Sequence, residues 1–364
     1  MKNLDIAHRR LHNQYISQQT CEKPADLVKY LGAVQAQDYA AAKWAVGLRL
    51  QDVTDNDIEQ ALTDGAILRT HVMRPTWHFV SPTDIRWMLA LTAPRVKVAM
   101  AYYDRTLELD EAAFMRSNAA LAKALQGGKQ LTRSQLATVL QQAGIACDNL
   151  QRLGHIIMRA ELDGIVCSGA RRGKQFTYAL LDERAPQART LDRDEALAEF
   201  AMRYFTSHGP ATLQDFVWWS GLTVADARAG LEMVKSQFIY EVIDGQTYWF
   251  SPSTPSANDL SHTAYLLPNY DEYIVGYTDR SAVFDASHTK KLDPRGNVLF
   301  NHTIVLDGRV AGTWKRTMKK DAVIITPNLF IPLNKAETRA FVASANRYGA
   351  FLERSVNVAF QHIL

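Results

Sequence analysis

The sequence has few of the features that mark secreted, metal-binding or membrane proteins. Its 364 residues include three cysteines, Cys21, Cys147 and Cys167, an odd number without Cys-x-x-Cys spacing. A disulfide framework or a zinc site is therefore not expected, and a reducing cytoplasm is the natural location. No apolar run approaches the length of a membrane span. The N-terminal segment runs into Arg9 and Arg10, where a signal peptide would be apolar, so we expect a cytoplasmic protein that binds no membrane.

Common catalytic motifs are also missing. The chain has no glycine-rich phosphate loop, no Gly-x-Ser-x-Gly elbow and no His-Glu-x-x-His helix, and its ten histidines are scattered. We therefore expect neither a metal nor an organic cofactor, which leaves a reaction with water or no reaction at all. A net charge of +3 does not require a nucleic-acid partner, although local clusters of Lys and Arg can still form a basic face.

The chain does contain one pattern in three degenerate copies, in which helices are followed by a short apolar hairpin. The hairpins lie at residues 67–70 with 76–80, 165–167 with 175–178, and 238–240 with 247–250. Helix, helix-turn-helix and hairpin together indicate a winged helix. We predict an α+β fold of three tandem winged-helix motifs followed by a small, barrel-like β-rich domain. The expected boundaries are a first winged helix at 1–82, a helical connector at 83–109, winged helices at 110–182 and 190–250, and the C-terminal domain at 260–364.

The second and third copies have clear start and stop signals. A helix is expected at 111–125, and Thr132 with Gln135 has the spacing of a capping box for the next helix. Thr212 caps the corresponding helix of the third copy, and Asp244-Gly245 predicts a two-residue hairpin turn.

The remaining parts are less regular. In the first copy we expect helices at 4–17, 25–34 and near 57–62, which makes 35–48 an insertion. The C-terminal domain shows short apolar segments at 265–267, 298–300, 303–306 and 322–325, a hairpin turn at Asp307-Gly308 and a final helix near 335–348.

Gln35, Gln37 and Asp38 lie at the start of the insertion. The two glutamines are two residues apart, so they share one side only if the segment is extended. Two amides on one side can hold a single water through complementary donor and acceptor contacts. Asp38 can orient the amides, accept a proton or cap the helix that follows. A polar turn without chemistry explains the same residues, and the spacing alone does not decide between these readings.

The first hairpin is crowded with polar and aromatic side chains. Strand alternation places Thr76, His78 and Val80 on one face, and Trp77 and Phe79 on the other. Arg74 and His78 are therefore either parts of a packed strand or polar groups presented to DNA.

Two further hairpin regions are basic. One carries Arg171, Arg172 and Lys174 between glycines, and a C-terminal one carries Arg309, Lys315 and Arg316. Such side chains neutralise phosphates. A charge run is often only a solvated face, but two of them on hairpins of tandem winged helices favour DNA binding.

The segment 31–42, Leu-Gly-Ala-Val-Gln-Ala-Gln-Asp-Tyr-Ala-Ala-Ala, resembles the signature of the AlkZ-like DNA glycosylases. Segments 69–80, 267–271 with Asp279-Arg280, and 305–314 are similar as well, so the resemblance spans almost the whole chain in the expected order. These are bacterial tandem winged-helix enzymes that excise alkylated purines and unhook some interstrand crosslinks. Their catalytic pattern of glutamine, apolar residue and glutamine matches Gln35, Ala36 and Gln37. Tyr39 departs from the pattern, because many members have proline there.

The resemblance implies a monofunctional DNA glycosylase for double-stranded DNA that carries N7- or N3-alkylated purines. Gln35 and Gln37 then position water, with Asp38 beside them, while Arg74, His78 and the basic hairpins bind DNA. It also implies a C-terminal hairpin that probes the lesion, which we place at 303–316. We expect a monomer. Two alternatives stay open: a non-catalytic winged-helix DNA-binding protein such as a transcription regulator, and a scaffold whose winged helices bind protein.

Overall fold

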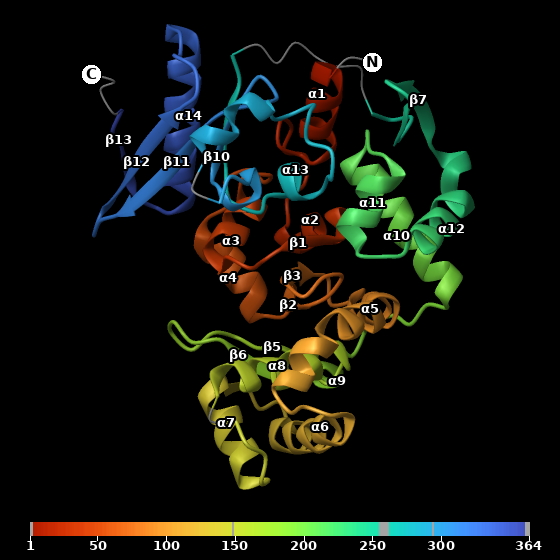
Figure 1. Ribbon diagram of the computed structural model, residues 1–364. Coiled ribbons are helices and arrows are strands. Elements are labelled where there is room, and N and C mark those ends of the chain that lie inside the picture. Colours follow the sequence, from red (N-terminus) through yellow and green to blue (C-terminus); the bar gives the residue numbers. More distant parts are fainter. Residues whose placement is uncertain (1–2, 148, 255–261, 293–294, 361–364) are drawn as a thin grey trace.

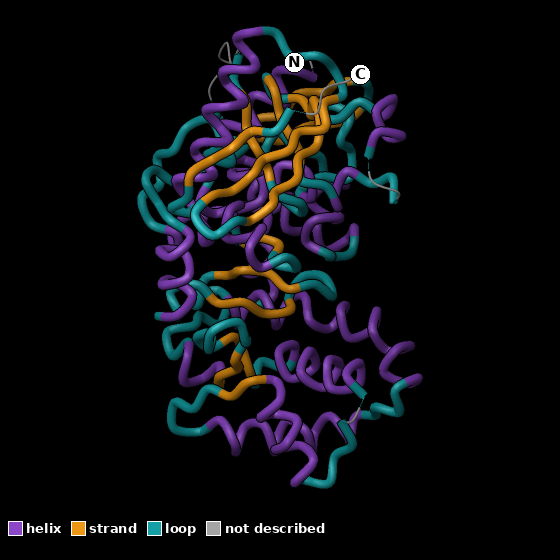
Figure 2. The backbone as a smooth tube through the Cα atoms, turned by 90° about the vertical axis from the view of Figure 1, so that its left-hand side faces the viewer, coloured by secondary structure: helices purple, strands orange, loops and turns teal. Residues whose placement is uncertain are grey.

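The computed structural model describes residues 3–147, 149–254, 262–292 and 295–360, and it shows an α+β fold. Three helix-and-hairpin units follow one another along the chain, and a curled sheet with a long helix comes last (Figure 1). The second unit forms one end of the molecule, whereas the first unit lies between the second unit and the C-terminal sheet (Figures 1 and 2). The segment that carries Gln35 is therefore supported from several directions.

Unit 1 covers residues 24–80 and begins with a proline in the first turn of a helix, where a missing N–H leaves no bond unmade. Its strands pair in the order β1-β3-β2, so the first strand extends the hairpin to a three-stranded sheet. Its elements are α2 (Pro24–Leu31), β1 (Ala33–Gln35), α3 (Tyr39–Gly47), α4 (Asp55–Thr63), β2 (Leu68–His71) and β3 (Trp77–Val80).

Unit 2 covers residues 111–180 and repeats this arrangement. Its sheet has the order β4-β6-β5, and Thr132 and Gln135 form the expected capping box. Its elements are α6 (Glu111–Leu125), β4 (Leu131–Thr132), α7 (Arg133–Gln142), α8 (Leu150–Leu162), β5 (Val166–Ser168) and β6 (Thr177–Leu180).

Unit 3 covers residues 193–250, and in place of a first strand it has a single bridge between Ala211 and Trp249. Thr212 caps its second helix as expected. Asp244 and Gly245 both take positive φ, which the predicted two-residue turn requires. Its elements are α10 (Arg193–His208), α11 (Leu213–Ser220), α12 (Val224–Val234), β7 (Ile239–Ile243) and β8 (Gln246–Phe250).

The C-terminal sheet has the order β13-β12-β11-β10-β9 and is antiparallel apart from its β12–β13 pair. Its ends, β13 and β9, do not pair with each other, so the sheet is curled but open, not closed as a barrel. Its elements are β9 (Ala264–Leu267), α13 (Glu272–Val275), β10 (Thr303–Leu306), β11 (Arg309–Met318), β12 (Ala322–Leu329), α14 (Lys335–Phe351) and β13 (Ser355–Val358).

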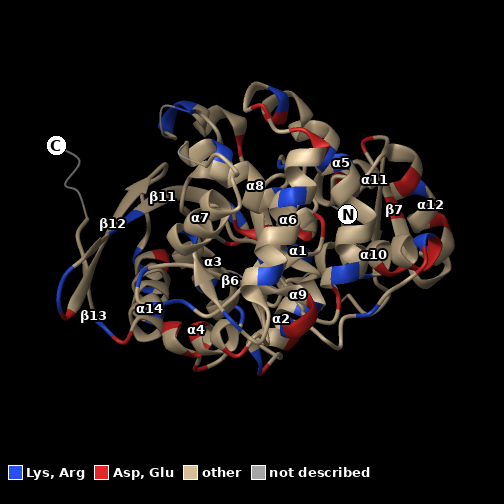
Figure 3. Cartoon of the chain, turned by 90° about the horizontal axis from the view of Figure 1, so that it is seen from below, with Lys and Arg blue, Asp and Glu red and all other residues tan. Residues whose placement is uncertain are grey.

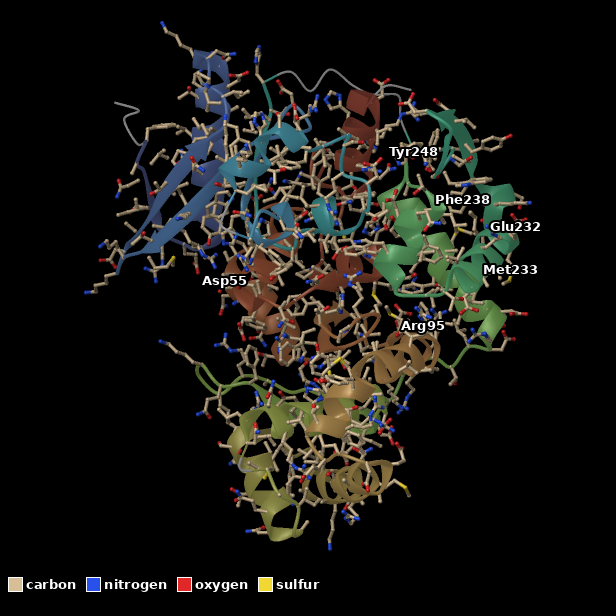
Figure 4. The ribbon with its side chains drawn as sticks, viewed as in Figure 1. Asp55, Arg95, Glu232, Met233, Phe238 and Tyr248 are labelled. Atoms are coloured by element: carbon tan, nitrogen blue, oxygen red, sulfur yellow. The ribbon has the colours of Figure 1, made fainter. Side chains whose placement is uncertain are left out.

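Three further helices connect these parts: α1 (Asn3–Asn13), α5 (Ile85–Thr106) and α9 (Leu181–Arg184). Helix α1 contacts unit 3, where Arg10 donates to the Pro210 carbonyl at 2.9 Å. It also contacts the β10–β11 turn, where His8 lies 3.2 Å from the Asp307 carbonyl. Arg95 of α5 reaches unit 3 and donates to the Gly221 carbonyl at 2.6 Å (Figure 4).

The buried apolar residues fall into separate clusters. One joins unit 1 to the C-terminal sheet, including Val34, Trp44, Phe79, Trp314 and Tyr348. A second joins unit 3 to α5 and to the other face of the unit 1 sheet. A third is drawn from residues 109–178 alone and forms the core of unit 2. Unit 1 therefore shares its core with its neighbours, whereas unit 2 has its own.

The structure corrects the prediction for the first copy. The predicted helix 25–34 ends at Leu31, and Gly32 with φ 82° turns the chain into β1. Residues 40–48 are not an insertion, because α3 is the second helix of unit 1, in the place that α7 has in unit 2. The predicted first helix, α1, lies outside the unit. A three-residue strand, Ala-Val-Gln, that begins two residues after the end of a helix has no periodicity of its own, so the sequence pattern merged the two.

The C-terminal prediction needs one further correction. The segment 298–300, expected as a strand, is a 3-10 helix capped by Asn297. The Asp307-Gly308 turn is confirmed, and both residues take positive φ.

Candidate functional site

The segment from Gln35 to Asp38 connects strand β1 to helix α3. Gln35 is the last strand residue and lies opposite His78, and the Ala36 N–H donates to the Trp77 carbonyl at 2.7 Å. Asp38 then caps α3 by accepting from the Ala41 N–H at 3.0 Å. Gln35 is thus on extended backbone, whereas Gln37 lies in the bend between β1 and α3, and both side chains contact the segment 74–77.

Gln35 is held from both its side chain and its backbone. It is 7% exposed, and its Oε1 accepts from Arg74 Nη2 at 3.0 Å. Its N–H donates to Glu272 Oε1 at 2.9 Å, a contact between residues 237 positions apart. Gln35 Nε2 has no hydrogen-bond partner within the described residues.

Gln37 is exposed and more loosely held. Its Oε1 accepts from the Trp77 N–H at 3.4 Å, which is long for a hydrogen bond. Its amide nitrogen contacts no acceptor in the part of the chain that the structure describes. The two amides therefore present unused hydrogen-bonding groups from adjacent positions on one edge.

Glu272, at the start of α13, is the buried centre beneath Gln35. It is 1% exposed, and its Oε2 accepts from Trp219 Nε1 at 2.8 Å and lies 3.4 Å from His208 Nε2. Burial alone would raise the pKa of Glu272. A hydrogen bond and charge at His208, a hydrogen bond from the Gln35 N–H and the charge of Arg74 all act in the opposite direction. They hold the pKa of Glu272 below its ordinary value. Glu272 is therefore an ionised carboxylate that connects unit 1, unit 3 and the C-terminal part.

Arg74 and His78 lie next to Glu272 and support Gln35. Burial lowers the pKa of His78 to about 3, and the charge of Arg74 adds to this shift, so the imidazole is neutral near pH 7. Its Nδ1–H donates to the Thr76 carbonyl at 3.0 Å, which leaves Nε2 as an acceptor 3.4 Å from Arg74 Nη2. Because His78 is 1% exposed, the packed-strand reading describes it better than a group presented to DNA.

The Arg74 side chain also contacts unit 3. Its Nη1 donates to the Trp219 carbonyl and lies 3.3 Å from the Trp218 carbonyl. Burial lowers the pKa of Arg74 from its ordinary value, opposed by the negative charge of Glu272. The guanidinium is thus committed to protein acceptors around Gln35, which the sequence did not indicate.

Asp38 performs the capping role that was one of its predicted alternatives. It also faces the C-terminal sheet, where it acts electrostatically on His302. Burial and the charge of Arg316 together lower the pKa of His302 to about 4, against the opposing charge of Asp38. Tyr39 is the first helical residue of α3, where proline is favoured, so the departure from the signature leaves the cap in place.

The second wing carries its three basic side chains in different environments. Arg171 is drawn onto unit 1, where it contacts Glu59 at 3.4 Å and lies over the Tyr39 ring. Arg172 is exposed and donates to the Gln130 carbonyl at 2.6 Å. Lys174 is exposed at the tip of the loop. Lys174 and Arg172 are therefore better placed than Arg171 to meet a DNA backbone.

The C-terminal basic residues are not one cluster. Arg309 begins β11, and at about 3.3 Å per residue it lies roughly 20 Å from Lys315. The Asp307-Gly308 turn packs against Ala7 and His8 of α1, so the hairpin expected at 303–316 is buried at its tip. The free hairpin is β11–β12, which carries exposed Lys315, Lys319 and Lys320 toward its turn. Arg316 donates instead to the Tyr348 hydroxyl.

Charge is distributed over the surface in small groups. In the view from below, Lys and Arg alternate with Asp and Glu over most elements and form no single basic patch (Figure 3). The β11–β12 turn and the β5–β6 wing nevertheless project to the same side of the molecule, on either side of α3 and α4 (Figure 1). Asp55 marks the start of α4 between them (Figure 4).

Several residues of the site had no sequence signal. Glu272 follows the singled-out segment 267–271 directly, but only folding brings it to Gln35. Trp219 and His208 come from unit 3. Arg69, in the singled-out hairpin, donates from Nε to the Ala36 carbonyl at 3.2 Å and so holds the residue between the glutamines.

Among the described positions, no three His, Cys, Asp or Glu side chains form a group that could hold a metal ion. No helix in the described ranges is long and apolar enough to cross a bilayer.

Comparison with known proteins gives the class of protein. Residues 28–351 match the family described as DNA glycosylase AlkZ-like, and the chain belongs to that family. A curated protein of Streptomyces sahachiroi, described as an interstrand DNA cross-link repair glycosylase, is 24% identical over 332 residues, which is 87% of this chain and 88% of that protein. The solved structure of Streptomyces sahachiroi DNA glycosylase AlkZ is similar with a TM-score of 0.80 and 19% identity, over 98% of this chain and 99% of that one. At 19% identity, the similarity to this solved structure establishes the fold.

Proposed function

We propose that this protein is a monofunctional DNA glycosylase that hydrolyses the N-glycosidic bond of cationic N7- or N3-alkylated purines, including those in interstrand crosslinks. In this proposal the three helix-and-hairpin units are winged helices that bind double-stranded DNA, and the protein acts as a monomer. The observation that carries it is the pair Gln35 and Gln37 at the junction of β1 and α3, whose amide nitrogens have no partner among the described residues. Membership of a DNA glycosylase family supports the same reading.

Neutral amides suit a cationic lesion. A purine alkylated at N7 or N3 already carries a positive charge, so the base leaves without help from a general acid. Hydrolysis then needs a water held near C1′ and a negative field for the cationic sugar. Gln35 and Gln37 hold the water, while Asp38 and the DNA phosphates supply the field. Asp38 retains this capacity because its cap uses one carboxylate oxygen.

The projecting basic segments support a DNA path past the amides. The β5–β6 wing with Arg172 and Lys174, and the β11–β12 hairpin with Lys315, lie on the side of the molecule that α3 and α4 share (Figure 1). Phosphate contacts from two separated hairpins fix the register of a duplex without reading its sequence. The β11–β12 hairpin is then the lesion-probing element, in place of 303–316. Because the bond to a cationic base is weak, a bulky lesion need not enter a deep base-flipping pocket.

The test is release of free base from duplex DNA that contains N7-methylguanine, compared with a duplex that contains uracil. The wild type is expected to release the methylated purine and not uracil, because uracil is a poor neutral leaving group. Gln37→Ala should lose the release while it keeps its DNA affinity. Comparable excision of uracil would contradict the reliance on a cationic base. Tight, salt-sensitive binding by both proteins without release from either N7-methylguanine or crosslinked DNA would instead favour a non-catalytic DNA-binding protein.

A further inference from the structure

We infer that the two glutamines have different roles: Gln35 donates a hydrogen bond to the attacking water, whereas Gln37 accepts one from it, and Arg74 imposes the difference. The inference rests on the proposed function, because it concerns the water of that reaction. Its basis is the set of hydrogen-bond partners around each amide.

The orientation of the Gln35 amide is fixed by its neighbour. A guanidinium has only donors, so the side-chain atom that lies 3.0 Å from Arg74 Nη2 must be the amide oxygen. The nitrogen therefore points away from Arg74, and it has no partner in the described residues. Gln35 is 7% exposed, and rotating the amide would place its N–H groups against the guanidinium. Arg74 thus turns the Gln35 oxygen inward and leaves the Nε2–H groups as the part of this amide that is free to meet a bound water.

Gln37 is oriented by a different donor. The backbone N–H of Trp77 faces its Oε1 at 3.4 Å, so the oxygen lies on the inner side of this amide as well. A carbonyl oxygen has two lone pairs, and this weak contact uses one of them. Because Gln37 is exposed, nothing comparable to Arg74 restrains its amide, and the second lone pair remains available for a water.

The chemistry of attack requires this asymmetry. A water that attacks C1′ must direct one lone pair at the carbon, and its other lone pair can accept a hydrogen bond. One of its protons needs an acceptor that draws it away from the sugar. Gln35 Nε2–H meets the first need and Gln37 Oε1 meets the second, from residues two positions apart where β1 ends.

Arg74 is a positioning residue in this arrangement. Its own orientation is set by acceptors on three sides: the Trp218 and Trp219 carbonyls of unit 3, and His78 Nε2 at 3.4 Å. His78 can accept because its Nδ1–H is committed to the Thr76 carbonyl at 3.0 Å. The Glu272 carboxylate holds the Gln35 backbone at 2.9 Å, so side chain and main chain are fixed independently.

A matched pair of substitutions tests the roles. Gln35→Glu and Gln37→Glu each convert an amide to a carboxylate, with the same change in size and charge. Gln35→Glu should lower the single-turnover rate of N7-methylguanine release by about 100-fold or more, because it removes the donor. Gln37→Glu should stay within about 10-fold of wild type, because a carboxylate still accepts. Equal losses, or the reverse order, would overturn the inference.

Three further variants separate positioning from folding and from DNA binding. Arg74→Met should lower the rate at saturating DNA without changing the dissociation constant for undamaged duplex, and Arg74→Lys should recover part of the rate. Gln35→Met, which has neither donor nor acceptor, should match Gln35→Glu in rate and thereby exclude an effect of the new charge.

Weaker DNA binding by Arg74→Met with an unchanged rate would assign Arg74 to DNA binding and overturn the inference. If the wild type releases base but the paired variants fall equally, the proposed function stands and the division of roles fails; absence of release by the wild type contradicts both.

Discussion

Units 1 and 2 share one order of elements but differ where the first strand meets the second helix. In unit 2 the last strand residue, Thr132, is itself the helix cap. In unit 1, Ala36 and Gln37 separate the last strand residue, Gln35, from the cap, Asp38. The two additional residues leave the capping rule intact and create an edge from which two amides project. A structural junction thus becomes a candidate site through a small local change.

The two junctions also treat their amides differently. Gln130, just before β4, accepts from the Ala170 N–H at 2.7 Å and so stabilises its own wing. Gln35 Oε1 instead accepts from Arg74 Nη2 at 3.0 Å. Further support for Gln35 comes from outside its unit, through Glu272 and through the Arg74 contacts with unit 3. The Gln130 side chain is thus held within unit 2, whereas the support of Gln35 extends to neighbouring parts of the molecule.

The largest expected difference between units 1 and 2 is whether each of them folds as an isolated fragment. A fragment of residues 107–184 contains the whole core of unit 2 and should unfold cooperatively. A fragment of residues 24–82 lacks the C-terminal half of its core and should be unfolded. Thermal melts followed by circular dichroism would check this, and a cooperative melt of the shorter fragment would break the comparison.

The next effect is on stability at Glu272. Glu272→Ala leaves the Gln35 N–H and the Trp219 indole N–H without their acceptor and removes a buried negative charge next to Arg74. The free energy of unfolding should fall by about 3–5 kcal/mol. Glu232 (Figure 4) lies at an exposed helix position where its carboxylate pairs with Lys235, and Glu232→Ala should change the free energy of unfolding by less than about 1 kcal/mol. If denaturant titrations gave equal losses of unfolding free energy for the two variants, the hydrogen bonds around Gln35 would not stabilise the fold.

A pH effect of intermediate size follows from the buried histidines. The folded-state pKa of His78 is about 3, below the unfolded value of 6.5, so the unfolded chain binds the proton first. Stability is therefore full above about pH 6.5 and falls as the pH is lowered toward 3, by about 2 kcal/mol for this residue at pH 5. Glu272 does not contribute to that window, because its lowered pKa leaves its stabilisation intact until the pH falls below its unfolded value of 4.5.

His78→Asn isolates this contribution. The loss of stability between pH 7.5 and pH 5.0 should be about 2 kcal/mol smaller in the variant than in the wild type. An unchanged loss, measured by denaturant unfolding at the two pH values, would mean that His78 titrates normally in the folded protein.

The smallest expected effect compares two cations of one wing. Lys174→Ala should lower the slope of log affinity against log salt by about one for each lost phosphate contact. Arg171→Ala should leave the slope unchanged, because Arg171 is already engaged with Glu59 and the Tyr39 ring. Equal changes in fluorescence-anisotropy titrations over a salt series would place both side chains on the DNA.

Local signals predicted the local structure well. The caps at Thr132 and Thr212, the helix at Glu111–Leu125 and the turns at Asp244 and Asp307 are all confirmed, because each depends on residues within a few positions. Strand β1 was missed, since the apolar residues Ala33 and Val34 after a helix continue its pattern. The strand explains why Gln35 lies on extended backbone.

Long-range contacts set the remainder of the site and had no sequence signal. Arg74 carries the same charge as the wing residues and was assigned with them, but burial and two carbonyls of unit 3 commit it to the protein. Glu272 reaches Gln35 across 237 positions. The basic residues of β11 were grouped by proximity in sequence, whereas the extended strand places Lys315 roughly 20 Å from Arg309.

The most direct measurement compares the two junctions in one assay. Single-turnover release of N7-methylguanine from duplex DNA should be measured for the wild type, Gln37→Ala and Gln130→Ala. We expect Gln37→Ala to fall by about 100-fold or more, while Gln130→Ala, which loses only the bond to its own wing, keeps the wild-type rate. Equal rates for all three proteins, or a larger loss for Gln130→Ala, would contradict the claim that the two residues inserted before Asp38 make the site.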